Sequence, residues 1–200
     1  MPGIYRFMLA VLVATTLSVT ATASADDWEN LTGRILVAKA DLQDPNFRES
    51  VIYLCRHDRT GAFGLMLNRP IATVPFSKLA KSFGIDSNDQ REVRVRQGGP
   101  VEIGLGFVIH SRDFNSKETV CAGDGFEVTA DLDVVRAIAH GEGPKRRIFL
   151  FGYAGWGAGQ LESEIERGSW EVIPGDPKLL FDDDPASLWH RAFERRGINL

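Results

Sequence analysis

Short runs of alternating apolar and polar residues recur along the chain, and this period of two is the pattern of half-buried β-strands. Turn-forming residues separate the runs, for example Asp44-Pro45-Asn46 and Asp58-Arg59-Thr60-Gly61. Because the second of these connections is short, the strands on its two sides are expected to form a hairpin. Alternation predicts a strand over residues 33–40, the β-branched and aromatic residues of 50–57 predict a second, and the apolar run over 147–153 predicts a central strand. Further short strands are expected over residues 62–68, 93–96, 106–111, 126–129 and 170–173.

Four other segments repeat their apolar residues every three or four positions, which is the spacing of amphipathic helices. These segments are residues 75–83, 130–140, 159–167 and 186–195. The last of them follows Asp184-Pro185, a pair that suits an N-cap and the first helical position. Residues 84–91 and 112–124 are polar and irregular, so we expect loops there.

The order of these elements indicates the fold class. Strands come first and are then interleaved with helices, without the regular spacing of repeated β-α-β units. The sequence therefore predicts an α+β protein with a mixed, mostly antiparallel sheet and about four flanking helices. The strand content is high enough for the sheet to curl into a barrel. We expect residues 26–200 to form a single domain.

The N-terminal segment differs from the rest of the chain. A positive start that includes Arg6 precedes an apolar run over residues 7–19, and Ala23-Ser24-Ala25 then supplies small residues. This three-part layout is typical of a secretory signal peptide. We expect residues 1–25 to be cleaved after Ala25, leaving a periplasmic protein without a transmembrane segment.

The net charge and the two cysteines bear on possible partners and on disulfide formation. The 200-residue chain has a formal net charge of −4, which disfavours nucleic-acid binding over the whole surface, although Lys145-Arg146-Arg147 leaves a local basic patch open. Export would allow a disulfide between the two cysteines, Cys55 and Cys121. Cys55 lies in an apolar run, however, and a buried free thiol is the favoured interpretation.

The most distinctive segment of the chain runs from Gly152 to Glu162, a glycine-rich stretch between a predicted strand and a predicted helix. Such a position suits a phosphate cradle. Gly155-x-Gly157-x-x-Gln160 nevertheless lacks the third glycine of a dinucleotide fingerprint, and no Gly-Lys-Ser/Thr follows. A close backbone crossing under Trp156 is the alternative. On the next helix, Glu162 and Glu166 share a face that we expect to point to water.

Several motif blocks, in order, resemble the YqgE/AlgH family of bacterial proteins. The resemblance covers nearly all of the predicted mature chain, and its strength lies in the number and order of the blocks. The blocks are Asp44-Pro45-Asn46-Phe47-Arg48, Ser50 to Cys55, Gly61 to Leu65, Asn68-Arg69-Pro70, Gly98-Gly99-Pro100-Val101, Gly106 to Ser111, Gly152 to Glu162, Trp170, Leu180-Phe181-Asp182 and Trp189.

The resemblance implies a compact α+β fold with a barrel-like sheet, and it supplies no catalytic residues. One branch of the family is named for the regulation of alginate production, and members are often labelled transcriptional regulators. This chain departs from the family at Lys39-Ala40, where members usually have Met-Pro, and in its export signal, which most members lack. A working signal argues against a direct role in transcription; a cytoplasmic protein, as in most of the family, is the alternative.

Candidate chemistry centres on His110, which ends a predicted strand beside Ser111. A pair of His110 with Ser111 or Cys55 could serve a hydrolase or transferase, but no G-x-S-x-G elbow supports it. The histidines have no metal-binding spacing, and we expect neither a metal nor a cofactor. The sequence instead favours a non-enzymatic binding or regulatory protein with an unidentified small ligand or protein partner, nucleic acid being disfavoured. The candidate binding residues are Gly155, Trp156, Gly157, Gln160, His110, Gly98 and Gly99.

Overall fold

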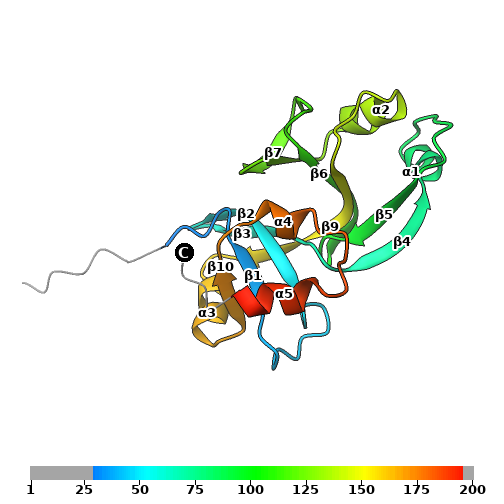
Figure 1. The fold of residues 1–200 in the computed structure, drawn as a ribbon. Coiled ribbons are helices and arrows are strands. Elements are labelled where there is room, and N and C mark those ends of the chain that lie inside the picture. Colours follow the sequence, from blue (N-terminus) through cyan, green and yellow to red (C-terminus); the bar gives the residue numbers. More distant parts are fainter. Residues whose placement is uncertain (1–28, 196–200) are drawn as a thin grey trace, which may run out of the picture.

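The computed structural model describes residues 29–195, so the predicted signal peptide lies outside the described residues. One half of the sheet is built from strands that follow one another in space, as Figure 1 shows. Strand β10 (Trp170–Ile173) lies beside β1 (Ile35–Ala38), followed by β2 (Val51–Asp58) and β3 (Gly61–Met66), all antiparallel. The predicted hairpin between β2 and β3 is therefore confirmed.

Strand β9 (Arg147–Gly157) joins the two halves of the structure. Its C-terminal part pairs with β3, whereas its N-terminal part lies between β5 (Glu92–Gln97) and β6 (Val101–Ser111). The β5–β9 pairing is parallel, and the other strand pairs of the described chain are antiparallel. The predicted mixed, mostly antiparallel sheet is thus present.

Two strands were not predicted. Strand β4 (Pro70–Pro75) pairs with β5, and β7 (Thr119–Gly123) pairs with β8 (Phe126–Thr129), which in turn pairs with β6. Both are largely exposed strands stabilised by a neighbouring strand, so they carry no alternating apolar pattern. The expectation of a continuous loop over 112–124 is wrong at β7 for this reason.

The four predicted helices are present, and a short fifth one joins them. Only the start of the last helix is misplaced: it begins at Leu188, after a turn, so Asp184 is not its N-cap. The helices are α1 (Phe76–Ser82), α2 (Asp133–Ala139), α3 (Gln160–Glu166), α4 (Pro177–Leu180) and α5 (Leu188–Glu194).

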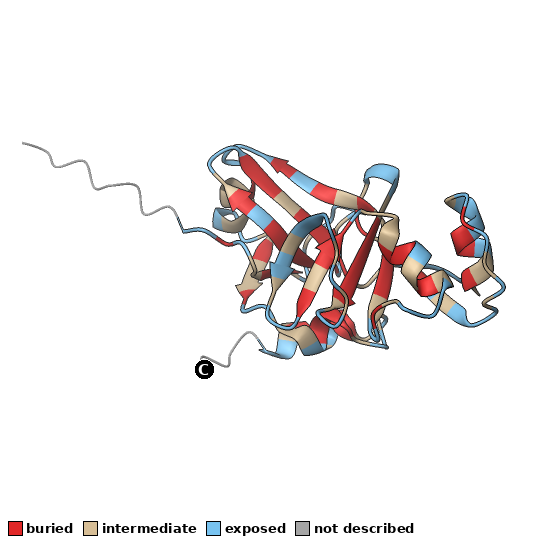
Figure 2. Ribbon diagram, turned by 90° about the horizontal axis from the view of Figure 1, so that it is seen from above, coloured by how far each residue is buried: buried red, intermediate tan, exposed pale blue. Residues whose placement is uncertain are grey.

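Buried side chains follow the strands and the inner faces of the helices, as Figure 2 shows. Ile35 and Val37 of β1 pack with α5, whereas the alternate residues Leu36 and Ala38 pack with Leu161 of α3. Because side chains alternate across a strand, α3 and α5 cover opposite faces of this half. Helices α1 and α2 pack on β5, β6 and β9 in a third hydrophobic cluster.

The sheet does not close into a barrel. Its path runs from β10 to β7, and these two strands are not paired with each other in the described chain. In Figure 1, β4 and β5 extend away from the β1–β3 half instead of curling back toward it. Among residues 29–195, no helix combines the length and the hydrophobicity needed to cross a bilayer.

Candidate functional site

The glycine-rich segment is mainly strand. Gly155, Trp156 and Gly157 lie in β9 opposite Phe63, Ala62 and Gly61 of β3, and the chain turns only after Gly157. The predicted end of this strand at Tyr153 is therefore wrong: the strand continues to Gly157 because β3 offers it a pairing partner. A Cβ on Gly61 would stand 2.1 Å from the carbonyl oxygen of Trp156, so close strand packing explains that glycine.

The buried pair Gly98-Gly99 contacts the same strand at an earlier point. A Cβ on Gly98 would lie 2.2 Å from the carbonyl oxygen of Gly152, and one on Gly99 would lie 2.0 Å from the carbonyl carbon of Tyr153. Gly98 also donates its N–H to the carbonyl oxygen of Phe151 over 2.7 Å. These glycines allow two backbones to approach closely, which accounts for both of them structurally.

The polar groups around Trp156 converge on Glu164. The indole N–H groups of Trp156 and Trp170 donate to Glu164 Oε2 over 2.9 and 2.8 Å, and Gln160 Nε2 donates to Glu164 Oε1 over 2.9 Å. Gln160 Oε1 accepts the N–H of Gly157. The side chain of Phe47 stacks on Trp156. This arrangement anchors α3 to β9 and β10, and the polar side-chain atoms of Trp156 and Gln160 take part in hydrogen bonds within the molecule.

Glu162 does not point simply to water. His57 Nδ1 accepts the N–H of Leu31 over 3.0 Å, so its Nε2 carries the proton and donates to Glu162 Oε1, also over 3.0 Å. The side chain of His57 is buried, and that of Glu162 is 33% exposed. The expectation of a solvent-facing Glu162–Glu166 pair is wrong for Glu162, because β2 places a histidine against this helix.

His110 is fully buried in β6 and does not contact the hydroxyl of Ser111. Its Nδ1 donates to the carbonyl oxygen of Ser111 over 3.0 Å, and its ring meets Phe114 edge to face. The Ser111 hydroxyl donates to Asp113 Oδ1 over 2.6 Å and accepts the N–H of Arg146. The nucleophile–base pair of the hydrolase alternative is therefore not formed at Ser111.

Cys55 is equally unsuited to that pair. It forms a disulfide with Cys121, which joins β2 to the edge strand β7 across 66 positions of sequence. A thiolate is the nucleophilic form of cysteine, and a bridged sulfur has none. The disulfide also corrects the favoured interpretation of Cys55 as a free thiol: Cys55 is buried as expected, but the fold brings an otherwise distant cysteine to it.

An open groove of about 800 Å³ lies along the candidate surface. Gly155 and Trp156 line it from β9, together with Tyr153, and other lining residues come from β2, β3, β6 and β7. The predicted residues Gly98, Gly99, Gly157, Gln160 and His110 are not among its lining residues. Its apolar walls include the exposed side chains of Val101, Leu105 and Val120.

Sequence reasoning missed those three wall residues. Val101 and Leu105 belong to a part of β6 that leaves the register: Val101 pairs with Tyr153, but the next paired residue is Gly106 with Phe151. The intervening residues bulge out of the ladder. The alternating apolar residues 101, 103 and 105 could have predicted a longer strand here. The predicted strand instead begins at Gly106 and leaves these residues out.

No group of three or more His, Cys, Asp or Glu side chains within residues 29–195 is placed to hold a metal ion. The site can instead offer an apolar surface bordered by the side chains of Arg56 and Glu102.

Comparison with other proteins gives consistent matches. Residues 35–200 match the family model DUF179, described as AlgH-like. A UPF0301 protein of Methylocella silvestris is 44% identical over 178 residues, which cover 84% of this chain and 86% of that protein. A UPF0301 protein of Rhodospirillum rubrum is 43% identical over 170 residues, covering 84% of this chain and 88% of the relative.

The fold also resembles solved structures. The solution structure of the AlgH protein from Pseudomonas aeruginosa superposes with a TM-score of 0.71 at 33% identity, covering 93% of this chain and 94% of that one. A crystal structure of protein DIP2367 from Corynebacterium diphtheriae, at 22% identity and a TM-score of 0.65, shares the fold over 84% of this chain and 87% of its own. The match over residues 35–200 shows that this chain belongs to the AlgH-like family.

Proposed function

We propose that the protein is a non-enzymatic binding protein that acts in regulation by holding an extended apolar segment of a protein partner in the groove beside Trp156. The observation that carries this proposal is the clustering of exposed apolar side chains. Five large hydrophobic side chains are exposed in the described chain, and three of them, Val101, Leu105 and Val120, line this groove. A contiguous exposed apolar patch is typical of a protein interaction site.

The polar groups of the groove favour a protein segment over a small molecule. Small-molecule sites usually present a few convergent polar groups that orient the ligand. Here the indole N–H of Trp156 is bonded to Glu164, and the hydroxyl of Tyr153 lies 3.4 Å from Glu102 Oε1, within hydrogen-bonding distance. Apart from the charged side chains of Arg56 and Glu102 at its border, the groove is lined mainly by apolar side chains and is open, which suits the side chains of an extended segment.

Selection of binding peptides from a random displayed library tests the proposal. A selected peptide is synthesised with a fluorophore, and its affinity for the purified protein is measured by fluorescence polarisation. Leu105→Asp and Val120→Asp place a charge in the groove on exposed positions, so the fold should tolerate them. Ile71→Asp is the matched control, because Ile71 is exposed on β4 and is not part of the groove.

We expect apolar peptides to bind the wild-type protein and the Ile71→Asp control with similar affinity. The two groove variants should weaken binding by about tenfold or more, the loss expected when a buried apolar contact is replaced by a desolvated charge. Peptides that bind all four proteins equally would overturn the proposal. The purified protein could instead retain a small apolar molecule. If the two groove variants lost that molecule and the Ile71→Asp control kept it, the occupant of the groove would not be a protein segment.

We also propose that the protein acts in the periplasm. The disulfide between Cys55 and Cys121 supports this location, since disulfides persist in oxidising compartments and are rare in the cytosol. Native mass spectrometry of protein purified from its own cells tests it. We expect a mature chain that begins at Asp26 and carries the disulfide; a chain that retains residues 1–25 and reduced cysteines would contradict export.

A further inference from the structure

A second cavity, of about 450 Å³, lies where β5 and β9 begin. These two strands are parallel neighbours, so their first residues reach the same edge of the sheet. The basic triplet Lys145-Arg146-Arg147 leads into β9, Arg91 directly precedes β5, and Arg94 and Arg96 lie within β5. We call this cavity the basic cleft. It collects in one place basic residues that lie some fifty positions apart in sequence.

The basic cleft carries a strong excess of positive charge. Six basic side chains line it, against the two acidic side chains of Glu92 and Asp183, although the whole chain has a net charge of −4. Burial together with the neighbouring Arg91 lowers the pKa of Arg147. A concave site with one sign of charge concentrates counter-ions of the opposite sign.

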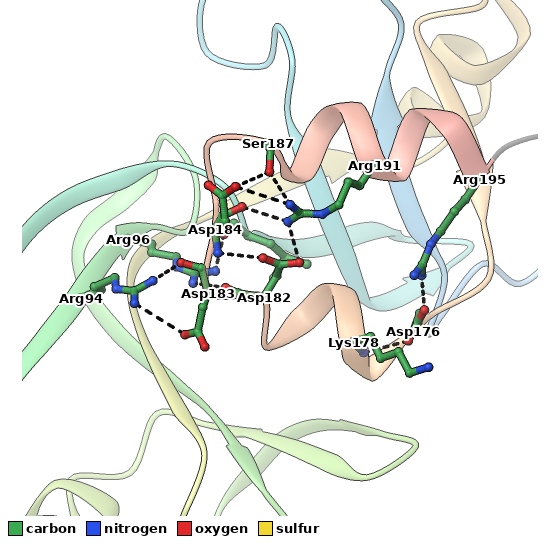
Figure 3. A network of polar contacts seen from close by, with 11 residues as sticks. Arg94, Arg96, Asp176, Lys178, Asp182, Asp183, Asp184, Ser187, Arg191 and Arg195 are labelled. Carbon is green, nitrogen blue, oxygen red and sulfur yellow. Dashed lines mark hydrogen bonds and ion pairs between the residues drawn. The ribbon is translucent and has the colours of Figure 1, made fainter.

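Arg96 is the buried centre of this charge, with only 3% of its surface exposed. Its Nη1 and Nη2 donate to the main-chain carbonyl oxygens of Leu67 and Asp182, over 2.7 and 2.6 Å, and its buried Nε has no hydrogen-bond partner within residues 29–195. The carboxylate of Asp182 is instead paired with Arg191 at 2.6 Å, as Figure 3 shows. Arg96 is therefore a buried cation held by neutral acceptors, an arrangement that a bound anion would stabilise.

Two neighbours of Arg96 are placed to meet such an anion. The guanidinium of Arg94 donates through Nη1 to the main-chain carbonyl oxygen of Asp183, as Figure 3 shows, whereas the carboxylate of Asp183 is 96% exposed and its Oδ1 lies 3.7 Å from Arg94 Nη2. An exposed ion pair at this distance is weak, so an incoming anion can replace the carboxylate at Nη2 while the main-chain hydrogen bond keeps Arg94 at the cleft. Arg146 lies over the ring of Phe181 at 4.3 Å, which holds its guanidinium at the cleft.

We propose that the basic cleft binds a small oligophosphate, a molecule that carries two or more linked phosphate groups. Guanidinium groups match phosphate oxygens in charge and in fork geometry, and several of them around one cavity require several anionic oxygens. The cavity size is that of a small-ligand site, and its apolar walls at Ile148 and Phe149 can hold an organic substituent. A long nucleic acid would instead need a basic stripe across the surface.

Isothermal titration calorimetry at one fixed, low ionic strength tests the proposal with inorganic pyrophosphate as the probe. Arg94→Gln and Arg146→Gln remove exposed cleft cations, whereas Asp183→Asn removes the competing carboxylate. Arg34→Gln is the matched control, since Arg34 faces Glu29 at the same 3.7 Å in an exposed pair outside the cleft. Orthophosphate, citrate and a short single-stranded DNA serve as comparison ligands, and circular dichroism checks the fold of each variant.

We expect pyrophosphate to bind more tightly than orthophosphate or citrate. Arg94→Gln and Arg146→Gln should each weaken binding about tenfold, the loss expected for one charge-assisted hydrogen bond. Asp183→Asn should tighten binding, and Arg34→Gln should leave it unchanged. No binding to the wild-type protein, or equal binding by all variants, would overturn the proposal. Tighter binding of DNA than of pyrophosphate would identify a nucleic-acid surface, and equal binding of citrate would exclude a preference for phosphate.

Discussion

Trp156 and Trp170 share one acceptor: their indole N–H groups both donate to Oε2 of Glu164, and their rings meet edge to face at 6.0 Å. Trp156 is the penultimate residue of β9 and Trp170 is the first residue of β10, so a single carboxylate on α3 connects the two strands. Both tryptophans are buried. The glycine-rich segment Gly152 to Glu162 therefore has a structural role: it holds α3 on the sheet.

Replacement of Glu164 by alanine should destabilise the protein. It leaves two buried indole N–H groups without their acceptor, and the loss of two charge-assisted hydrogen bonds should cost roughly 2–4 kcal/mol of unfolding free energy. Urea denaturation followed by tryptophan fluorescence measures the change. Glu166→Ala, at an exposed position two residues along the same helix, should stay within about 0.5 kcal/mol of wild type. Equal effects at the two positions would contradict the role assigned to Glu164.

Replacement of Gly98 by alanine tests whether the Gly98-Gly99 pair is structural. The added Cβ would lie 2.2 Å from the carbonyl oxygen of Gly152, and a main-chain oxygen in a sheet has little room to move. We expect a loss of at least about 2 kcal/mol in unfolding free energy from this overpacking. Gly104→Ala is the control, because a Cβ there has no atom within 4 Å. A stable Gly98→Ala protein that had lost only peptide binding would instead place Gly98 in the binding surface.

Local patterns predicted the elements that bury one face. The continuous apolar run of β2 and the spacing of Leu161 and Ile165 on α3 both reflect contact with the core, so local sequence locates these two elements. Strands β4 and β7 escaped prediction because pairing with a neighbouring strand stabilises them, and that neighbour is not visible in their own residues. The end of β9 was misplaced for the same reason: its partner, β3, lies far away in sequence.

The candidate site was predictable only in part. The glycine motif located Gly155 and Trp156 at the groove, but the walls at Leu105 and Val120 come from β6 and β7, whose approach depends on the whole topology. Lys145-Arg146-Arg147 was recognised as a basic cluster, whereas its partners on β5 depended on a parallel pairing that no local pattern encodes. Sequence spacing thus identified individual residues of the groove and of the basic cleft. It did not identify the residues from other strands that complete each site.

Tyr53 should make the protein sensitive to alkaline pH. Its ring is buried against Phe126, and burial raises the pKa of its hydroxyl above the ordinary value of 10.0. The folded state therefore holds this proton more tightly than the unfolded chain does. The resulting stability is complete below the unfolded pKa and is lost as the pH rises above it.

Urea denaturation at pH values on both sides of 10 measures this effect, and Tyr53→Phe keeps the ring while removing the titrating group. The wild-type protein should lose stability over this range more steeply than the variant does. Parallel pH profiles for the two proteins would show that the hydroxyl of Tyr53 ionises equally well in both states.

Removal of the disulfide should loosen the edge of the sheet at β7. The link between Cys55 and Cys121 closes a loop across 66 sequence positions, and in the chain-entropy account such a cross-link contributes roughly 4 kcal/mol by restricting the unfolded chain. The double variant Cys55→Ala, Cys121→Ala should lose most of this stability in urea denaturation. In the double variant, the amides of β7 should also exchange faster with deuterium than those of β2. The reason is that β7 pairs only with β8 in the described chain. Unchanged stability and unchanged exchange at β7 would show that strand pairing alone holds this edge.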